Sequence, residues 1–334
     1  MADITIIMPA FNKEKYITEA LDSVFMQETT YDYHLIVADD CSTDKTTEIV
    51  KEYQIKYPNK ITLLTSEKNQ KLYKNVLRAY AITKTDYFCV LDPDDFWIDK
   101  HKIQNALDFL EKNKDYTIYV TDTLQQLPDG TRSPLIKRRH IKNSCFNDFL
   151  KGKAALGCTL GSTFRNVIFK NGLPDKMQNL VSSTNEQAFR GDSFRSAIHL
   201  HEGKAHCVPK ADAVYRITEE GLWMGSSRLG QNLLTANFYK DMYFYFDKKY
   251  PELLVISFNA FNVLKHTLSE DLSQINDENK ILQTVKKIAD LQKIYNENIE
   301  LIKTARNKNL PLRFKISMLL YETVAKKLIK KGII

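Results

Sequence analysis

Short apolar runs alternate with helical patterns through residues 1–120. The runs are continuous rather than alternating, which is typical of strands buried on both faces, and they lie at 4–8, 34–38, 61–64, 87–91 and 118–120. Between them, apolar residues recur every three or four positions, which predicts helices at about 16–25, 43–57, 72–82 and 99–112. This order predicts an α/β fold with a Rossmann-like, mostly parallel sheet and helices on both faces. Ligands bind such a sheet at the carboxyl ends of its strands.

Beyond residue 122 the pattern is less regular. The segment 127–130, Leu-Pro-Asp-Gly, has the composition of a hairpin turn. Further short strands are expected near 161–165 and 206–216, around a helix that carries Asp192. From about residue 230 onward the chain has a helical pattern with few Gly and Pro residues.

The chain has 334 residues and a net charge of +7, which is concentrated near its end. Residues 303–331 hold nine Lys and Arg against one acid, Glu322. Within them, residues 312–329 form a basic helix pattern with an apolar side. Two interpretations stand: peripheral contact with an anionic membrane, or packing on the body or a second subunit to form a homo-oligomer. Tail charge alone provides no surface for reading nucleic acid, so no nucleic-acid partner is expected.

Five cysteines, an odd number without a CxxC pair, favour a reduced compartment over a disulfide framework or a zinc site. The first residues lack the basic segment and cleavage site of a signal peptide. No run approaches the ~18 apolar residues of a spanning helix. We therefore expect a cytoplasmic protein, at most peripheral on the inner face of the cytoplasmic membrane.

Two of the predicted strands end in acid clusters. Asp39 and Asp40 close the second strand, and Asp92, Asp94 and Asp95 close the fourth. Carboxylates this close repel one another unless a cation or a donor-rich ligand neutralises them. Mg²⁺ and Mn²⁺ take few protein oxygens and leave positions for phosphate, so a strand-end pair suits a metal–diphosphate. The alternative is that both clusters are solvated turn and cap residues.

Three segments together resemble family 2 glycosyltransferases with the GT-A fold, of the inverting bacterial type. They are Ile6-Ile7-Met8-Pro9-Ala10-Phe11-Asn12, Leu35-Ile36-Val37-Ala38-Asp39-Asp40-Cys41-Ser42-Thr43-Asp44 and Leu91-Asp92-Pro93-Asp94-Asp95-Phe96-Trp97. The resemblance is strong over 3–112, fair over about 160–227 and absent afterwards. It implies a catalytic domain over 1–228, with a nucleotide-binding half (1–112) and an acceptor-side half (113–228), and then a helical C-terminal region over 229–334.

The resemblance also implies roles by position. The nucleotide pocket would be lined by Pro9, Ala10, Phe11 and Asn12. Asp40 would accept a hydrogen bond from a uracil ring, whereas Asp39 would be structural. Lys71 and Asn75 would approach the base and ribose, with Lys71 standing where the family often has Gly.

For the metal, the resemblance implies Mn²⁺ or Mg²⁺ with Asp94 as its direct ligand. Asp92 would lie near the ribose and the metal. For Asp95 a structural reading is open, as the cap of a helix that Phe96 and Trp97 introduce.

The catalytic base implied by the resemblance is Asp192, an acid that opens a helix in the second half. An inverting transferase needs such a carboxylate to take the proton of the attacking hydroxyl. The alternative for Asp192 is a helix-start acid favoured by the macrodipole, with Glu186 as the next candidate base. Arg216 and Trp223 match a loop near the donor diphosphate, in which the family's usual His is Thr218.

These assignments predict a glycosyltransferase of the hexosyl- or N-acetylhexosaminyltransferase class. Its partners would be a nucleotide-sugar donor, a UDP-sugar, and a glycan or lipid-linked saccharide acceptor. The composition, rich in Lys, Asn and Ile and low in Gly, fits a bacterium and hence surface polysaccharide synthesis. Two alternatives stay open. One is a sugar-nucleotide-binding protein without transferase activity, and the other is a nucleotidyltransferase, whose Gly-rich loop is not found after the first strand.

Two further groups favour structural roles. His199 and His201 lie on different faces of a predicted helix, so a second metal site that includes His206 is not expected. An aromatic run is typical of a helix core stripe, with sugar stacking on the acceptor side as the alternative, and it comprises Phe238, Tyr239, Tyr243, Phe244, Tyr245 and Phe246.

Overall fold

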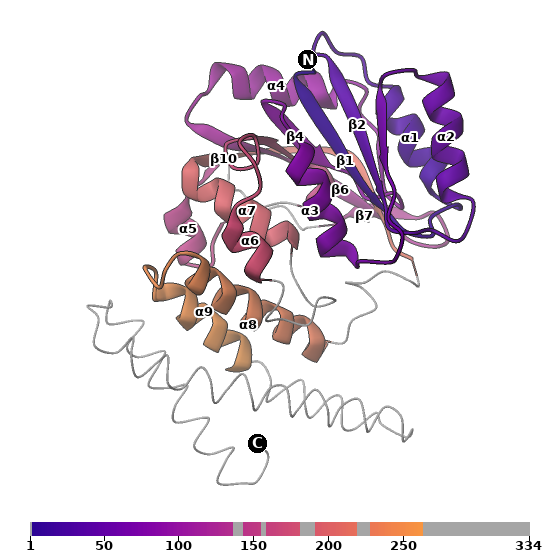
Figure 1. The fold of residues 1–334 in the computed structure, drawn as a ribbon. Coiled ribbons are helices and arrows are strands. Elements are labelled where there is room, and N and C mark those ends of the chain that lie inside the picture. The colour runs from indigo at the N-terminus through magenta and orange to yellow at the C-terminus, as the bar shows by residue number, and fades with distance from the viewer. Residues whose placement is uncertain (1, 136–142, 155–157, 181–190, 219–227, 263–334) are drawn as a thin grey trace, which may run out of the picture. The chain divides into compact units, whose positions relative to one another are not determined.

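The computed structural model describes residues 2–135, 143–154, 158–180, 191–218 and 228–262 (Figure 1). The chain divides into two compact units, and each is described by itself. The first unit comprises Met1–Phe149, Lys153–Gln187 and Gly191–Thr218, and the second comprises Leu150–Gly152, Ala188–Arg190 and Glu219–Ile334.

The first unit is built on one sheet, in which ten strands are described. They are β1 (Ile4–Ala10), β2 (Tyr33–Asp39), β3 (Ile61–Leu64), β4 (Tyr87–Val90), β5 (Phe96–Trp97), β6 (Tyr116–Gln126), β7 (Arg132–Pro134), β8 (Asn143–Ser144), β9 (Ser162–Arg165) and β10 (Lys204–Arg216). Their spatial order is β3-β2-β1-β4-β9-β6-β10-β5, with β7 beside β6 and β8 beside β10. Strands β1 to β4 are parallel, as are β6 and β10, whereas β9 runs antiparallel between β4 and β6. The predicted α/β fold with a mostly parallel sheet is confirmed.

Helices cover both faces of this sheet (Figure 1). They are α1 (Ile17–Phe25), α2 (Thr46–Lys56), α3 (Leu72–Ile82), α4 (Lys102–Lys112), α5 (Phe146–Leu150), α6 (Asp175–Leu180) and α7 (Gly191–Glu202), with a 3-10 turn at Thr159–Gly161. Helices α1, α2 and α4 share one core cluster with the side chains of β1 that point their way, such as Ile6. On the other face, Tyr80 of α3 stacks on Phe169 with ring centroids 4.2 Å apart and meets Phe88 of β4.

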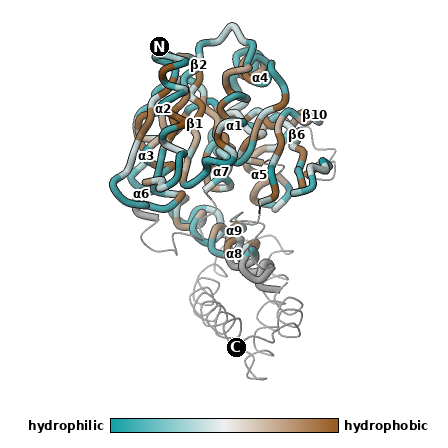
Figure 2. Tube along the Cα trace, turned by 90° about the vertical axis from the view of Figure 1, so that its right-hand side faces the viewer, coloured by the Kyte–Doolittle hydropathy of each residue, from teal (hydrophilic) through white to brown (hydrophobic). Residues whose placement is uncertain are grey.

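Burial explains why the sequence pattern predicted these strands. Every residue of β1 is buried, so its side chains on both faces must be apolar or hydrogen-bonded. Figure 2 shows this as brown hydrophobic segments in β1 and its neighbours, among helices in which brown and teal alternate. The predicted hairpin turn is also confirmed, because the Gly130 amide donates to the Leu127 carbonyl at 2.9 Å and β7 pairs with β6.

One local prediction was wrong. Phe96 and Trp97 do not introduce a helix but form β5, which pairs antiparallel with Ala213 and Val214 of β10. A strand of two residues has no periodicity from which it could be recognised, and its partner lies more than a hundred residues away.

The described part of the second unit contains α8 (Arg228–Tyr245) and α9 (Glu252–Asn262). The Ser257 hydroxyl of α9 donates to the Ala236 carbonyl of α8 at 2.8 Å. Phe238 and Tyr243 are buried and Phe244 is exposed, which favours the core-stripe interpretation of the aromatic run. Among the described residues, no helix has the length and apolar character needed to cross a membrane. The basic segment 312–329 lies outside the described residues.

Candidate active site

The carboxyl ends of β1 and β2 are joined by hydrogen bonds between their loops. The Asn12 side-chain oxygen accepts from the Thr43 amide at 2.8 Å, and the Asn12 amide donates to the Ser42 hydroxyl at 3.0 Å. Asn12 and Cys41 both have positive φ, 51° and 65°, which turns the two loops sharply away from the strands. Phe11 is 42% exposed at this edge. A loop pair fixed in this way can present backbone and side chains to a flat ligand without first ordering itself.

The two acids of β2 have different surroundings. Asp39 accepts hydrogen bonds from the Ser42 amide and the Thr47 hydroxyl, both at 3.2 Å, as its expected structural role requires. Asp40 is 2% exposed, and its Oδ1 accepts from the Gln70 amide at 2.7 Å. That hydrogen bond places the loop before α3 against the end of β2. The uracil contact of Asp40 remains a prediction.

The other residues expected to line the nucleotide pocket differ in accessibility. Pro9 and Ala10 are buried within β1, so they can shape the predicted pocket only through the path of their backbone. Lys71 is exposed, with φ of 71°, directly before α3. Asn75 is 1% exposed, and its amide donates to the Ala38 carbonyl at 2.6 Å. Asn75 therefore supports the end of β2, and its approach to the base and ribose remains a prediction.

The acids that follow β4 crowd one another. Burial raises the pKa of Asp92 to about 7, and the charges of Asp94 and Asp192 add to this effect while Arg195 opposes it. Burial, followed by the charges of Asp92 and Asp94, also raises the pKa of Asp95 well above its ordinary value. These carboxylates are thus gathered at one point of the sheet edge, where their charges are incompletely balanced.

Asp95 has a role that the sequence did not predict. Its Oδ1 accepts from the Arg216 amide at 2.8 Å, so it joins the turn after β4 to the end of β10. Its Oδ2 is buried and has no hydrogen-bond partner among the described residues. Asp95 therefore does not cap a helix, and the correction follows from the finding that Phe96 and Trp97 form a strand.

Lys13 is a further residue of this site that sequence reasoning missed. Its ammonium lies 2.8 Å from Oδ2 of Asp94, while its backbone amide donates to the Thr46 hydroxyl at 2.7 Å. The only signal in the sequence is a basic residue directly after Asn12. Its partner is 81 positions away, so no local pattern reveals the pair.

Asp192 lies in the first turn of α7, where its carboxylate accepts from the Ser193 amide at 2.6 Å. It is exposed, yet its charge acts on Asp92, so the two carboxylates share one electrostatic environment. One turn further along α7, the buried Arg195 donates to the Tyr80 hydroxyl at 2.7 Å and lies over the Phe164 ring. Arg195 was not predicted, and its charge lowers the pKa of Asp92.

Arg216 is joined to the acid cluster through its backbone amide, and aromatic rings hold its side chain. Its guanidinium lies 5.0 Å from the centre of the Tyr16 ring and 5.2 Å from that of the Phe96 ring, and it pairs with Glu19. The side chain is only 13% exposed. Trp223 and Glu186 lie outside the described residues, and their roles remain predictions.

Comparisons with known proteins bear on these observations. The model of the family "Glycosyl transferase family 2" matches residues 5–172, which include β1 to β4 and the acids after them. The chain belongs to glycosyl transferase family 2. A Mycobacterium tuberculosis protein, Rv1520, is 26% identical over 224 residues, 66% of this chain and 60% of that protein. The dTDP-rhamnosyl transferase RfbG of Shigella flexneri is 31% identical over 156 residues, 46% of this chain and 52% of that protein.

Solved structures share the GT-A fold of this family 2 chain. A TarS fragment of S. aureus in complex with UDP has a TM-score of 0.58 at 16% identity, covering 99% of this chain and 92% of that one. The mannosyltransferase PcManGT of Pyrobaculum calidifontis, with GDP-Man and Mn²⁺, has a TM-score of 0.52 at 15% identity, covering 89% and 83%. At this identity the likeness concerns the fold. Our chain spans about 60% of the length of the mycobacterial relatives it matches.

The acids of this family 2 chain fit a hard divalent cation. Asp92 and Asp94 offer oxygen donors close together, and the buried Oδ2 of Asp95 beside them has no hydrogen-bond partner among the described residues. No cluster of three or more acids, histidines or cysteines able to hold a metal occurs in the described part of the chain. Mg²⁺ and Mn²⁺ are commonly held by one or two protein carboxylates, with phosphate oxygens and water as the other ligands.

His199 and His206 lie in unlike surroundings. His199 is fully buried among aromatic rings, and its Nδ1 donates to the Arg195 carbonyl at 2.8 Å. Burial lowers the pKa of His199 to about 3, so it is neutral. His206 instead stacks on Phe109 with ring centroids 4.1 Å apart. These contacts account for His199 and His206 as packing residues.

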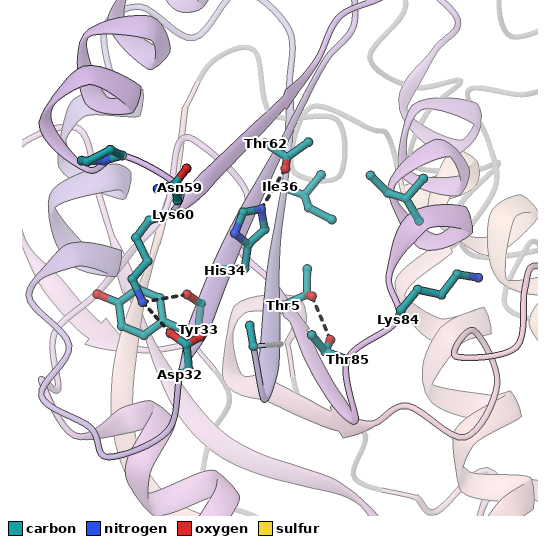
Figure 3. A pocket seen from close by; sticks show the side chains of 13 residues that line it. Thr5, Asp32, Tyr33, His34, Ile36, Asn59, Lys60, Thr62, Lys84 and Thr85 are labelled. Atoms are coloured by element: carbon teal, nitrogen blue, oxygen red, sulfur yellow. Dashed lines mark hydrogen bonds and ion pairs between the residues drawn. The ribbon is translucent and has the colours of Figure 1, made fainter.

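A cavity of about 450 Å³ lies at the other end of the strands, between β1 to β3 and the residues that follow α3. Figure 3 shows that its polar side chains largely face one another. Thr5 and Thr85 share a hydrogen bond of 2.8 Å, as do His34 and Thr62. None of the residues expected to bind the donor lines this cavity.

Proposed function

We propose that this chain transfers a sugar from a UDP-sugar to a hydroxyl group of a glycan or lipid-linked saccharide, with inversion and with the help of Mn²⁺ or Mg²⁺. One observation carries the proposal: carboxylates from β2, from the turn after β4 and from the start of α7 lie at the ligand-binding edge of a family 2 glycosyltransferase fold. A role in bacterial surface polysaccharide synthesis agrees with relatives such as the "minor teichoic acid biosynthesis protein GgaB" of Bacillus subtilis, 36% identical over 115 residues.

The loops that follow β1 and β2 would bind the nucleotide part of the donor. Asp40 would accept a hydrogen bond from the uracil N–H, and Phe11 and Asn12 would border the base. The choice of a UDP-sugar is supported by the solved TarS complexes with UDP and UDP-GlcNAc, which share the fold. Because both loops are already fixed by hydrogen bonds, little ordering free energy would be lost on binding.

The acids after β4 would hold the diphosphate through the cation. Asp94 would be a direct ligand and Asp92 would lie beside it, and the cation would neutralise the charge that develops on the leaving diphosphate. Arg216 would add a fixed positive charge near the diphosphate, on a side chain kept in place by Tyr16 and Phe96. Fixed charges of this kind stabilise a leaving diphosphate more strongly where bound substrates exclude water than they do in bulk water.

The transfer step needs one proton acceptor. The carboxylate of Asp192 would take the proton of the acceptor hydroxyl as that oxygen forms a bond to the anomeric carbon. The bond between the anomeric carbon and the diphosphate oxygen breaks at the same time, and its electron pair leaves with UDP. Attack from the face opposite the leaving group inverts the anomeric configuration. The exposure of Asp192 leaves it accessible to a second substrate.

Release of UDP from a UDP-sugar, with Mn²⁺ and an acceptor extract, tests the proposal. We expect turnover by the wild type and almost none by Asp94→Asn, which should also lose any tightening of UDP binding by Mn²⁺. Asp32→Asn is the matched control, because Asp32 pairs with Lys60 at the amino end of the strands and has no proposed contact with the donor. Equal UDP affinity of the wild type with and without Mn²⁺ would exclude the metal assignment.

A further inference from the structure

Lys13 is anchored at its backbone and paired at its side chain. The backbone amide donates to the Thr46 hydroxyl, which is fully buried at the start of α2, so the main chain at Lys13 is fixed. The ammonium meets Oδ2 of Asp94 at 2.8 Å, with the two side chains 18% and 20% exposed. Movement at this position is therefore confined to the side chain, and solvent is within its reach.

A second lysine–aspartate pair in the same unit shows what a permanent ion pair looks like. Lys102 lies 2.8 Å from Oδ1 of Asp212, but these side chains are only 2% and 4% exposed. The Thr121 hydroxyl donates to the same carboxylate oxygen at 2.6 Å, which leaves the pair fully enclosed and hydrogen-bonded. The Lys13–Asp94 pair has the same length without this enclosure. Separation of Lys13 from Asp94 leaves both charges in contact with solvent, whereas separation of Lys102 from Asp212 would leave buried charges without a partner.

The Lys13 ammonium contacts Oδ2 of Asp94, an oxygen that would also be a ligand of the proposed metal. A Mg²⁺ or Mn²⁺ ion lies about 2.0–2.2 Å from a carboxylate oxygen, so an ammonium held at the same oxygen would lie close to the ion and repel it. The metal ion can bind Asp94 only if the Lys13 ammonium moves away from this oxygen. The lysine stem has four rotatable bonds and its fixed backbone keeps the ammonium near the same edge.

We propose that Lys13 is the resident counter-ion of Asp94: a divalent cation displaces it, and the freed ammonium then binds the diphosphate of the nucleotide donor. This inference rests on the proposed function, because it takes Asp94 as the metal ligand. It adds a specific consequence, namely that Lys13 opposes metal binding before the donor arrives and favours donor binding afterwards. An ammonium is a suitable phosphate partner as a mobile point charge.

Calorimetric titration of Mn²⁺ into the donor-free protein tests the first half. Lys13→Met keeps most of the side-chain volume and removes the charge, and we expect it to bind Mn²⁺ about five- to tenfold more tightly than the wild type, since a competing cation at short range is removed. Lys15→Met removes the same charge from an exposed lysine two positions along and should leave Mn²⁺ affinity within about twofold. Lys13→Gln gives the same comparison if the methionine variant folds poorly, and thermal melting verifies folding.

Titration of UDP at saturating Mn²⁺ tests the second half. Lys13→Met should bind UDP about tenfold more weakly, the effect of one lost charge-assisted phosphate contact, while Lys15→Met should match the wild type. Equal Mn²⁺ affinity and equal UDP affinity of Lys13→Met and the wild type would overturn the Lys13 inference alone. Absence of Mn²⁺ binding by both proteins, with or without UDP, would overturn it together with the metal assignment of the proposed function.

Discussion

The two ends of β1, β2 and β3 carry opposite kinds of polar surface. At the amino ends, several of the polar groups that line the cavity of about 450 Å³ are paired with one another, such as Thr5 with Thr85 and Lys60 with Asp32. At the carboxyl edge of the sheet, Asp92, Asp94 and Asp95 crowd together, and one buried oxygen has no partner among the described residues. Paired groups have little to gain from a ligand, whereas incompletely balanced charges do. The candidate site is therefore identified by its incompletely balanced charges and not by the volume of a cavity.

Replacement of the proposed base at the carboxyl edge of the sheet should have the largest effect on activity. Asp192→Asn keeps the shape of the side chain but cannot accept the proton of the attacking hydroxyl. We expect the transfer rate to fall by about 100- to 10,000-fold, with UDP-sugar affinity roughly unchanged. Initial rates and calorimetry separate the two quantities. Near-normal turnover would move the base elsewhere, with Glu186 the next residue to replace.

Arg195 is a buried positive charge that acts on Asp92, one of the carboxylates that follow β4. Arg195→Met leaves the buried Tyr80 hydroxyl without its donor and withdraws a positive charge from Asp92. We expect the free energy of unfolding to fall by about 1–3 kcal/mol, together with a loss of activity. Denaturant unfolding and initial rates measure these effects.

Tyr80→Phe is the control for that variant, since it removes the hydrogen bond and keeps the charge. It should cost less stability and retain most of the activity. If both variants lose activity equally, activity depends on the hydrogen bond between Arg195 and Tyr80 and not on the effect of the Arg195 charge on the carboxylates after β4.

The amino-end cavity should tolerate change. His34 donates to or accepts from Thr62 there, and His34→Ala removes that contact without touching the acid edge. We expect transfer rates within about twofold of the wild type, as for most substitutions away from a site. A larger loss, in a variant that melts normally, would indicate that the cavity contributes to substrate binding.

The smallest effect on catalysis is expected from the C-terminal basic segment. Deleting residues from 312 onward removes most of the basic residues of 303–331. It should abolish binding to anionic liposomes while leaving the hydrolysis of a soluble UDP-sugar intact. Co-sedimentation at rising salt should show the wild type released, because exposed charges are screened. Failure of the intact protein to bind such liposomes would favour packing of this segment on a partner subunit.

The sequence predicted the fold well because continuous apolar runs reflect burial on both faces. It placed the acids correctly at strand ends, since local order along the chain fixes which residues follow β2 and β4. It could not predict the pairings that cross the sheet. Lys13 meets Asp94 over 81 positions and Arg195 meets Tyr80 over 115, and neither pair leaves a periodic trace. The sequence also did not predict β5, because this two-residue strand is recognised by its pairing with β10.

Hydrogen–deuterium exchange with and without UDP and Mn²⁺ tests directly which end of the strands binds the ligand. We expect slower exchange at residues 10–13, 40–43 and 94–97, where the amides border the proposed donor site. Residues 58–62 and 82–85, around the amino-end cavity, should exchange at unchanged rates. Protection confined to those amino-end residues, while UDP is bound, would show that the donor does not bind at the carboxyl edge of the sheet.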